Sequence, residues 1–126
     1  MRKKKVMIVD DEEDVVTFLK VLLEDNGYEV RSASNSEQAL EDIKQGKPDL
    51  ICLDILMPGS SGISLHKLLK ESEETRAIPA LIVSGLNIKE EIARGEIGFA
   101  GIKQNEYIEK PIDAQEFLSK VKRLVG

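Results

Sequence analysis

Hydrophobic residues follow two alternating patterns along the chain. Short continuous apolar runs recur, and between them apolar residues return at the three- and four-residue spacing of an amphipathic helix. A run that is apolar at every position predicts a strand buried on both faces, as in a parallel sheet covered by helices. Three runs are clear and two are weaker: residues 6–9, 50–53 and 80–83, then 28–30 and 107–108.

The segments between these strands predict helices. Their apolar stripes are Val15, Leu19, Leu22 and Leu23, then Ala39, Leu40 and Ile43, then Leu65, Leu68 and Leu69, and finally Leu118, Val121 and Leu124. Asn26–Gly27 is a helix-ending pair, and Asp113 with Glu116 reads as a capping box at the start of the last helix. We expect a further helix from about Ile88 to Arg94. Glycines then interrupt residues 94–105, where we expect a long flexible approach to the fifth strand.

Five repeats of strand then helix predict an α/β fold. Right-handed crossovers give a doubly wound, five-stranded parallel sheet in a three-layer αβα sandwich. The flavodoxin-like strand order 2-1-3-4-5 makes the first and third strands neighbours. We expect residues 1–126 to form one domain, because this length is near the commonest domain size.

Composition excludes several classes of protein. Hydrophobic residues make up 41% and charged residues 33%, which is typical of a globular protein. No apolar run approaches the length of a membrane span, and the basic start at residues 2–5 lacks the apolar region of a signal peptide. We therefore expect a cytoplasmic chain without membrane contact.

The single cysteine and the charge balance narrow the chemistry further. Cys52 lies in an apolar run, so we interpret it as a small buried hydrophobe, and one cysteine excludes an internal disulfide. The net charge is -5 and aromatic residues make up only 4%. Direct nucleic-acid binding by this chain is therefore not expected.

Polar residues stand where the predicted strands end. Asp10 and Asp11 follow the first strand, Asp54 ends the third, Ser84 the fourth, and Lys110 with Pro111 the fifth. Ligands of open parallel sheets bind outside these carboxyl ends, where the strand order reverses. Three carboxylates, a hydroxyl and an ammonium group should therefore converge on one crevice.

Three neighbouring carboxylates repel one another unless a cation joins them. A hard divalent ion suits oxygen ligands, and Mg²⁺ suits a site with few protein ligands and room for phosphate oxygens. A carboxylate held there can also attack phosphorus and form an aspartyl phosphate. Lys110 would neutralise charge on the transferred group, and Ser84 would donate a hydrogen bond to it.

With these residues in place, the chain resembles the receiver domain of two-component response regulators over essentially its whole length. The matching segments are VMIVDDEEDV, PDLICLDILMPGSSG, ALIVSG and YIEKPI, in that order and each at a strand end. Each segment alone is weakly specific. All four together make the resemblance strong.

The resemblance implies a role for each position. Asp54 is the phosphoacceptor, and Asp10 and Asp11 hold Mg²⁺ together with Asp54 and the backbone carbonyl of Leu56. Ser84 is the switch hydroxyl and Tyr107 the switch aromatic residue that moves with it. Lys110 forms a salt bridge to the phosphoryl group, and a cis peptide bond joins it to Pro111.

Two departures from the family pattern stand out. Leu56 and Leu86 are apolar where family members often carry polar side chains near the attacking water, so dephosphorylation is not predictable. The spacing from Ser84 to Lys110 is also several residues longer than is usual. This places the fourth helix, and the choice of partner on that face, in doubt.

Each residue taken alone has an ordinary structural interpretation. Asp10 and Asp11 suit a helix N-terminus, and Asp54 suits a turn. Tyr107 alone is more often a core or edge-strand aromatic residue than a switch. His66, the only histidine, is interpreted as a lone exposed residue. Only the joint pattern favours the functional interpretation.

Three other functions fit the sequence less well. A phosphatase of the haloacid dehalogenase type needs a second acid two residues after its nucleophile, where this chain has Leu56. A receiver-like module that works by contacts alone is disfavoured by the full set of acidic residues with Ser84 and Lys110. A nucleotide or flavin carrier is disfavoured because no glycine-rich phosphate loop follows the first strand.

The sequence therefore predicts a phosphorylation switch rather than a multiple-turnover enzyme. By resemblance, a histidine kinase or histidine phosphotransfer protein supplies the phosphoryl group, and acceptance is self-catalysed and followed by slow loss. Phosphorylation would shift the face formed by the fourth helix, fifth strand and fifth helix, and so act on an output domain or partner protein. Dimerisation on activation is left open.

Overall fold

The computed structural model describes residues 2–57, 60–85, 87–95 and 102–125. Its main sheet contains five parallel strands: β1 (Lys5–Val9), β2 (Glu29–Ala33), β3 (Leu50–Asp54), β6 (Ala80–Ser84) and β7 (Tyr107–Glu109). Their order is β2-β1-β3-β6-β7, which is the predicted 2-1-3-4-5 order when the main-sheet strands are numbered along the chain. The predicted fold class is confirmed.

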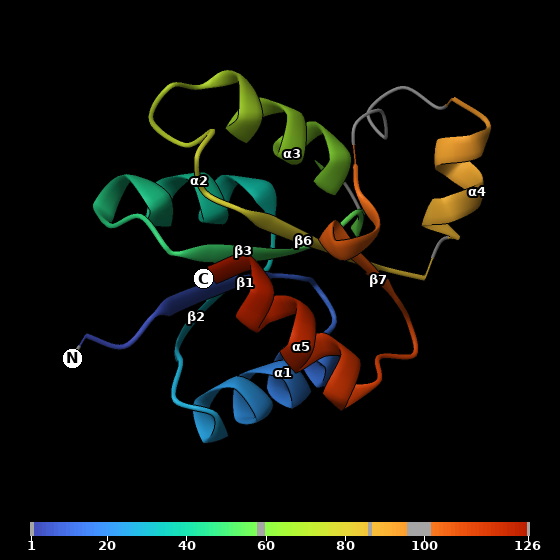
Figure 1. Ribbon diagram of the computed structural model, residues 1–126. Coiled ribbons are helices and arrows are strands. Elements are labelled where there is room, and N and C mark those ends of the chain that lie inside the picture. Colours follow the sequence, from blue (N-terminus) through green and yellow to red (C-terminus); the bar gives the residue numbers. More distant parts are fainter. Residues whose placement is uncertain (1, 58–59, 86, 96–101, 126) are drawn as a thin grey trace.

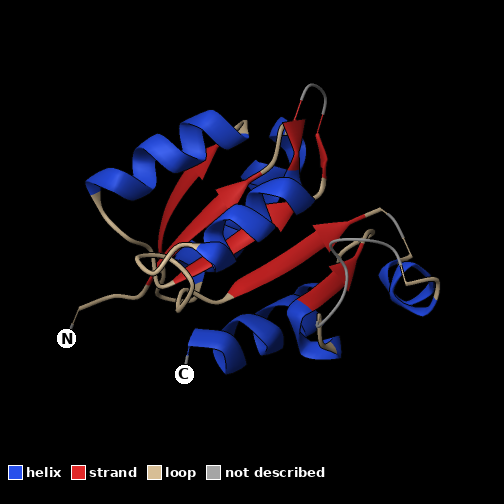
Figure 2. Ribbon diagram, turned by 90° about the horizontal axis from the view of Figure 1, so that it is seen from above, coloured by secondary structure: helices blue, strands red, loops and turns tan. Residues whose placement is uncertain are grey.

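Helices cover both faces of the sheet (Figures 1 and 2). Two of them, α1 (Glu13–Asp25) and α5 (Ala114–Val125), pack on one face, while α2 (Ser36–Gln45) and α3 (Gly62–Glu71) lie on the other. A short helix, α4 (Ile88–Ala93), stands beyond the β6–β7 end of the sheet. A 3-10 turn, η1 (Gln104–Glu106), leads directly into β7.

Local sequence signals account for several helix ends. The side chains of Asn35, Asn87 and Asp113 each accept a hydrogen bond from a backbone N–H three residues later, as helix-capping residues do. Gly27 follows α1 with φ of 88°, a left-handed conformation that suits glycine after a helix C-terminus. Helix α4 begins and ends as predicted, with Arg94 as its C-cap.

Alternate strand residues face two separate cores. The α1–α5 core contains eleven buried residues, including Ile8, Cys52 and Phe117, and the α2–α3 core contains nine, including Ile51 and Leu65. A third and smaller cluster, formed by Ile55, Ile82 and Ile102, lies toward α4 and β7. Strands β1, β3 and β6 are thus covered on both faces, which explains their continuous apolar sequences.

The structure corrects three details. Leu68 belongs to the predicted stripe of α3 but is 54% exposed, while Leu65 and Leu69 are buried. In α5, Phe117 is fully buried and was missing from the predicted stripe, whereas Leu118 and Leu124 are only partly buried. A short antiparallel pair, β4 (Leu56–Met57) and β5 (Ser60–Ser61), also follows β3 and was not predicted.

One expectation falls partly outside the described residues. The flexible approach to the fifth strand was expected over residues 94–105, of which 96–101 are not described. Leu86, one of the two departures from the family pattern, is not described either.

Candidate functional site

The predicted site residues meet at the carboxyl edge of the sheet. Asp10 follows β1, Asp54 is the last residue of β3, Ser84 is the last residue of β6, and Lys110 follows β7. These four strands are consecutive in the sheet. The parallel register therefore brings residues separated by up to a hundred positions to one crevice.

Buried backbone contacts hold these residues in place. Asp10 and Asp54 are only 3% and 2% exposed, and Ser84 is fully buried. The N–H of Asp10 donates to the carbonyl of Ala33 at 3.1 Å, and Asp10 Oδ1 accepts from the N–H of Glu12 at 2.9 Å. Neither Asp10 nor Asp11 is the N-cap of α1, which is Glu12 and makes no side-chain cap. The alternative role of the acidic pair as an N-cap is therefore wrong.

The Lys110 ammonium group lies among three carboxylates. Its Nζ is 2.7 Å from Glu12 Oε1, 3.5 Å from Asp10 Oδ2 and 3.6 Å from Asp54 Oδ2. The N–H of Lys110 also donates to the carbonyl of Ser84 at 2.8 Å, which fixes the backbone of Lys110 beside β6. This arrangement directs the ammonium group across the sheet edge toward Asp54.

Charge at this edge controls the protonation of Lys110. Burial by itself lowers the pKa of the ammonium group, but the hydrogen bond to Glu12 and the charges of Asp10, Asp54 and Glu12 together raise the pKa above its ordinary value. Lys110 is therefore a fixed positive charge at physiological pH.

Carboxylate oxygens of Asp10, Glu12 and Asp54 lie within 4.8 Å of one another, so the three residues could hold a metal ion. Three carboxylates around one ammonium group leave this cluster negatively charged, and its all-oxygen donors fit a hard divalent cation. Glu12 was not among the site residues predicted from the sequence. Its position two residues after Asp10 was the signal that could have placed it in the site.

Asp11 lies differently from its neighbours. It is exposed and is not one of the three residues in the carboxylate cluster, although it lines an adjoining groove of about 300 Å³ with Asp10 and Glu13. The assignments of Asp11 and of the Leu56 backbone carbonyl as metal ligands remain predictions.

Tyr107 borders the small isoleucine cluster. Its half-buried side chain packs against the cluster of Ile55, Ile82 and Ile102, and its backbone pairs with Ile82 of β6. Ser84 ends the same strand, β6, two residues later. The two predicted switch residues thus lie on neighbouring strands at one end of the sheet.

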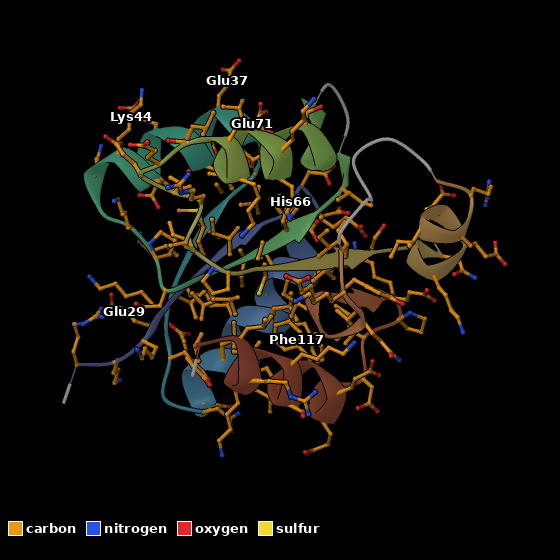
Figure 3. The ribbon with its side chains drawn as sticks, turned by 45° about the horizontal axis from the view of Figure 1, so that its top comes forward. Glu29, Glu37, Lys44, His66, Glu71 and Phe117 are labelled. Carbon is orange, nitrogen blue, oxygen red and sulfur yellow. The ribbon has the colours of Figure 1, made fainter. Side chains whose placement is uncertain are left out.

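Three further expectations concern single residues. The Lys110–Pro111 peptide bond is cis, the form expected from the sequence. Cys52 is buried as expected, and desolvation raises the pKa of its thiol to about 12. His66 is not exposed but half-buried, on the side of α3 that faces the rest of the protein (Figure 3). This burial, with a smaller contribution from Lys70, lowers the pKa of the imidazole, while Glu106 opposes the shift.

Comparison with known families decides what this site is. The family model for the response regulator receiver domain matches residues 6–122. The chain belongs to this family. The predicted resemblance is confirmed, and the site at the carboxyl edge of the sheet is that of a receiver domain.

Individual relatives agree with the family match. The chain is 37% identical to the phosphate regulon transcriptional regulatory protein PhoB of Pseudomonas aeruginosa, over 97% of its own length and 52% of PhoB. It is 35% identical to the polar-differentiation response regulator DivK of Brucella anthropi, over 98% of this chain and 97% of DivK. It therefore spans about half of one relative and nearly all of the other.

Solved structures support the same fold. A putative response regulator from Chloroflexus aurantiacus superposes with a TM-score of 0.85 at 33% identity, covering 98% of both chains. The receiver domain of a signal transduction histidine kinase from Syntrophus aciditrophicus gives a TM-score of 0.83 at 30% identity, covering 97% of this chain and 89% of the other. In the described part of the chain, no helix has the length and apolar content needed to cross a bilayer.

Proposed function

We propose that this receiver domain is a phosphorylation switch in which Asp54 accepts a phosphoryl group with Mg²⁺ present. The observation that carries the proposal is the placement of the Lys110 ammonium group 3.6 Å from Asp54 Oδ2 and 3.5 Å from Asp10 Oδ2. This geometry sets a carboxylate nucleophile beside a fixed cation that can neutralise a transferred phosphoryl group.

The reaction needs little from the protein beyond position and charge. A carboxylate oxygen of Asp54 attacks the phosphorus of the donor, and an O–P bond forms while the bond from phosphorus to the leaving group breaks. The leaving group departs with that electron pair. Lys110 would then exchange its contact with Glu12 for one with a phosphoryl oxygen, and Ser84 would donate its hydroxyl hydrogen bond to another.

Bound Mg²⁺ would neutralise the remaining charge of the carboxylates and of the phosphoryl oxygens. The proposed ligands are Asp10, Asp11, Asp54 and the Leu56 carbonyl. Glu12 lies in the same cluster, but its charge is already offset by Lys110 at 2.7 Å. We therefore expect Asp11→Asn to weaken Mg²⁺ binding more than Glu12→Gln does, measured by calorimetric titration. The reverse order would assign the ligand role to Glu12.

A protein donor has an accessible approach to this edge of the sheet. A groove of about 270 Å³ beside Lys110 is lined by Val15, Phe18, Pro111 and Ile112, together with Asp14. Phe18 is 45% exposed, and Val21 on the same helix is 52% exposed. Exposed apolar surface beside a reactive residue supports docking of a histidine kinase or histidine phosphotransfer protein here.

Phosphorylation would change the positions of Ser84 and Tyr107. Their movement would shift the face formed by α4, β7 and α5, and so act on an output domain, a partner protein or a second copy of the chain. Acceptance would be self-catalysed and reversed slowly, without turnover of a substrate pool. A cytoplasmic location is part of the proposal and rests on the family.

The deciding experiment is intact mass spectrometry after incubation with acetyl phosphate and Mg²⁺. We expect one phosphoryl adduct on the wild-type chain, and none with Asp54→Asn or with EDTA. Asp25→Asn, which changes an exposed carboxylate at the far end of α1, is the matched control and should accept phosphate normally.

Three results would contradict the proposal. An adduct that persists in Asp54→Asn would show that another residue accepts the phosphoryl group. A complete lack of adduct and of Mg²⁺ binding would favour the contact-only interaction module. A sustained turnover of acetyl phosphate would instead favour a phosphatase, which the apolar Leu56 at the expected acid position argues against.

A further inference from the structure

Lys120 is a largely buried cation at the edge of the sheet, far along the chain from the acidic site. Its side chain is only 16% exposed, although it is a lysine on an outer helix. A buried lysine needs partners for its ammonium group, because desolvation disfavours the charge. The groups that the Lys120 ammonium contacts therefore indicate the structural role of this residue.

The Lys120 ammonium group binds the segment that contains Tyr107. It donates to the carbonyl of Tyr107 at 2.6 Å and to the carbonyl of Gln104 at 3.1 Å. It also lies 5.4 Å from the centroid of the Tyr107 ring, within cation–π distance. A third group, Glu116 on the preceding turn of α5, lies 3.5 Å away and anchors the ammonium from its own helix.

These contacts fall on the shortest strand of the main sheet. Strand β7 has three residues and lies at the sheet edge, where β6 is its only partner among the described strands. On the side of β7 that carries Tyr107, the neighbouring core is the small cluster of Ile55, Ile82 and Ile102, while Ile108 on the other side is buried in the α1–α5 core. Because few buried residues pack on the Tyr107 side of this strand, the polar contacts from α5 contribute a large share of the restraint on Tyr107.

We propose that Lys120 is a positioning residue that holds the Tyr107 ring in its present place and so opposes the switch. The inference rests on the proposed function, because it concerns the equilibrium that phosphorylation of Asp54 is proposed to shift. A contact made in only one of two states biases the equilibrium toward that state. Any ligand that favours the other state must overcome this bias, and its apparent affinity falls accordingly.

The test measures binding of beryllofluoride with Mg²⁺, a mimic of the aspartyl phosphate, by calorimetric or NMR titration. Lys120→Met keeps the aliphatic stem and removes the charge, and we expect it to tighten the apparent affinity about two- to fivefold, the factor expected for one partly exposed cation–π contact. Lys120→Arg keeps a cation over the ring and should restore the wild-type affinity. Lys122→Met, at an exposed position on the same helix, should leave the affinity unchanged.

A double-mutant cycle separates action through the ring from a general structural effect. In a Tyr107→Leu background, Lys120→Met should change the affinity much less, because the cation–π contact is already absent and only the hydrogen bonds to backbone carbonyls remain to be lost. Thermal denaturation of each variant records any loss of stability separately. If Lys120→Met shifts the affinity equally with and without the Tyr107 ring, the inference is wrong.

The ring can also be observed directly. The chain has two tyrosines and no tryptophan, so in Tyr28→Phe the tyrosine fluorescence comes from Tyr107 alone. In that background, and without Mg²⁺ or beryllofluoride, Lys120→Met should change quenching of Tyr107 by the neutral quencher acrylamide, while Lys122→Met should not. Unchanged quenching and unchanged affinity would overturn the inference. A wild-type chain that fails to bind beryllofluoride would overturn the proposed function itself, and this inference with it.

Discussion

The two ends of the sheet are supported very differently. Strands β1 and β3 lie between the α1–α5 core of eleven buried residues and the α2–α3 core of nine. On the side of β7 that faces α4, the described residues form a buried cluster of only three, with Ile92 and Tyr107 packed against it, while Ile108 on the other side of β7 joins the α1–α5 core. The number of well-packed neighbours governs how easily a segment opens locally, so we expect the α4 side of the β7 end to open more easily than β1 and β3.

The functional residues follow this division. Asp10 and Asp54, which the proposed function requires to stay fixed relative to a phosphoryl group, extend from the doubly covered strands. The predicted switch residue Tyr107 lies on the strand beside the small cluster. A rigid acceptor next to a weakly supported strand is a physically reasonable way to convert a local change in charge into movement.

Phe117→Ala should have the largest effect on stability. Phe117 is fully buried in the α1–α5 core, and loss of such a side chain costs about 3–5 kcal/mol in the free energy of unfolding. Urea denaturation measures the loss. Lys122→Ala on the exposed face of the same helix should change the free energy by less than about 0.5 kcal/mol.

A matched pair of isoleucines compares the two regions directly. Ile51→Ala, in the α2–α3 core, should cost about 3–4 kcal/mol, whereas Ile102→Ala, in the small cluster and 9% exposed, should cost about 1–2 kcal/mol. Equal losses in urea denaturation would show that the β7 end is packed as firmly as the rest.

The pH dependence of stability tests whether water reaches Cys52 in the α1–α5 core. Its thiol has a pKa of about 12 in the folded protein against an ordinary value of 9.0, so the unfolded chain ionises first as the pH rises. The contribution of Cys52 to stability is therefore complete below pH 9 and declines between pH 9 and 12. From pH 8 to pH 10 the wild type should lose about 1 kcal/mol more than Cys52→Ala. Parallel pH profiles of the two proteins would mean that water reaches Cys52.

His66 gives the smallest and most local test, at the junction of the two regions. Burial lowers the pKa of its imidazole below 6.5, so protonation of the unfolded chain should reduce stability as the pH falls below that value. The single histidine gives one NMR titration curve. Glu106→Gln should lower its midpoint further, because Glu106 in η1 raises the pKa. An unchanged midpoint would show that Glu106 in η1 does not influence the pKa of His66 in α3. Glu109→Gln serves as a matched control and should leave the midpoint unchanged.

Much of the fold and of the site could be predicted because the signals are local. Continuous apolar runs predict doubly covered strands, and in a parallel sheet the residues that follow these runs necessarily share one edge. Asp10, Asp54, Ser84 and Lys110 could therefore be placed together before any distance was known. The exposed Leu68, by contrast, follows the same spacing as its buried neighbours, and no local pattern distinguishes it.

The sequence by itself determined the order of elements, the strand order and which residues gather at the carboxyl edge, because these depend on periodicity and chain connectivity. Only the tertiary structure decided which charged groups touch. The Glu12–Lys110 contact joins residues 98 positions apart, and Lys120 meets Tyr107 across two elements. Such contacts depend on distances of a few ångströms between packed helices and strands. Those distances are set by the packing of the whole core, and the spacing of residues along the chain does not predict them.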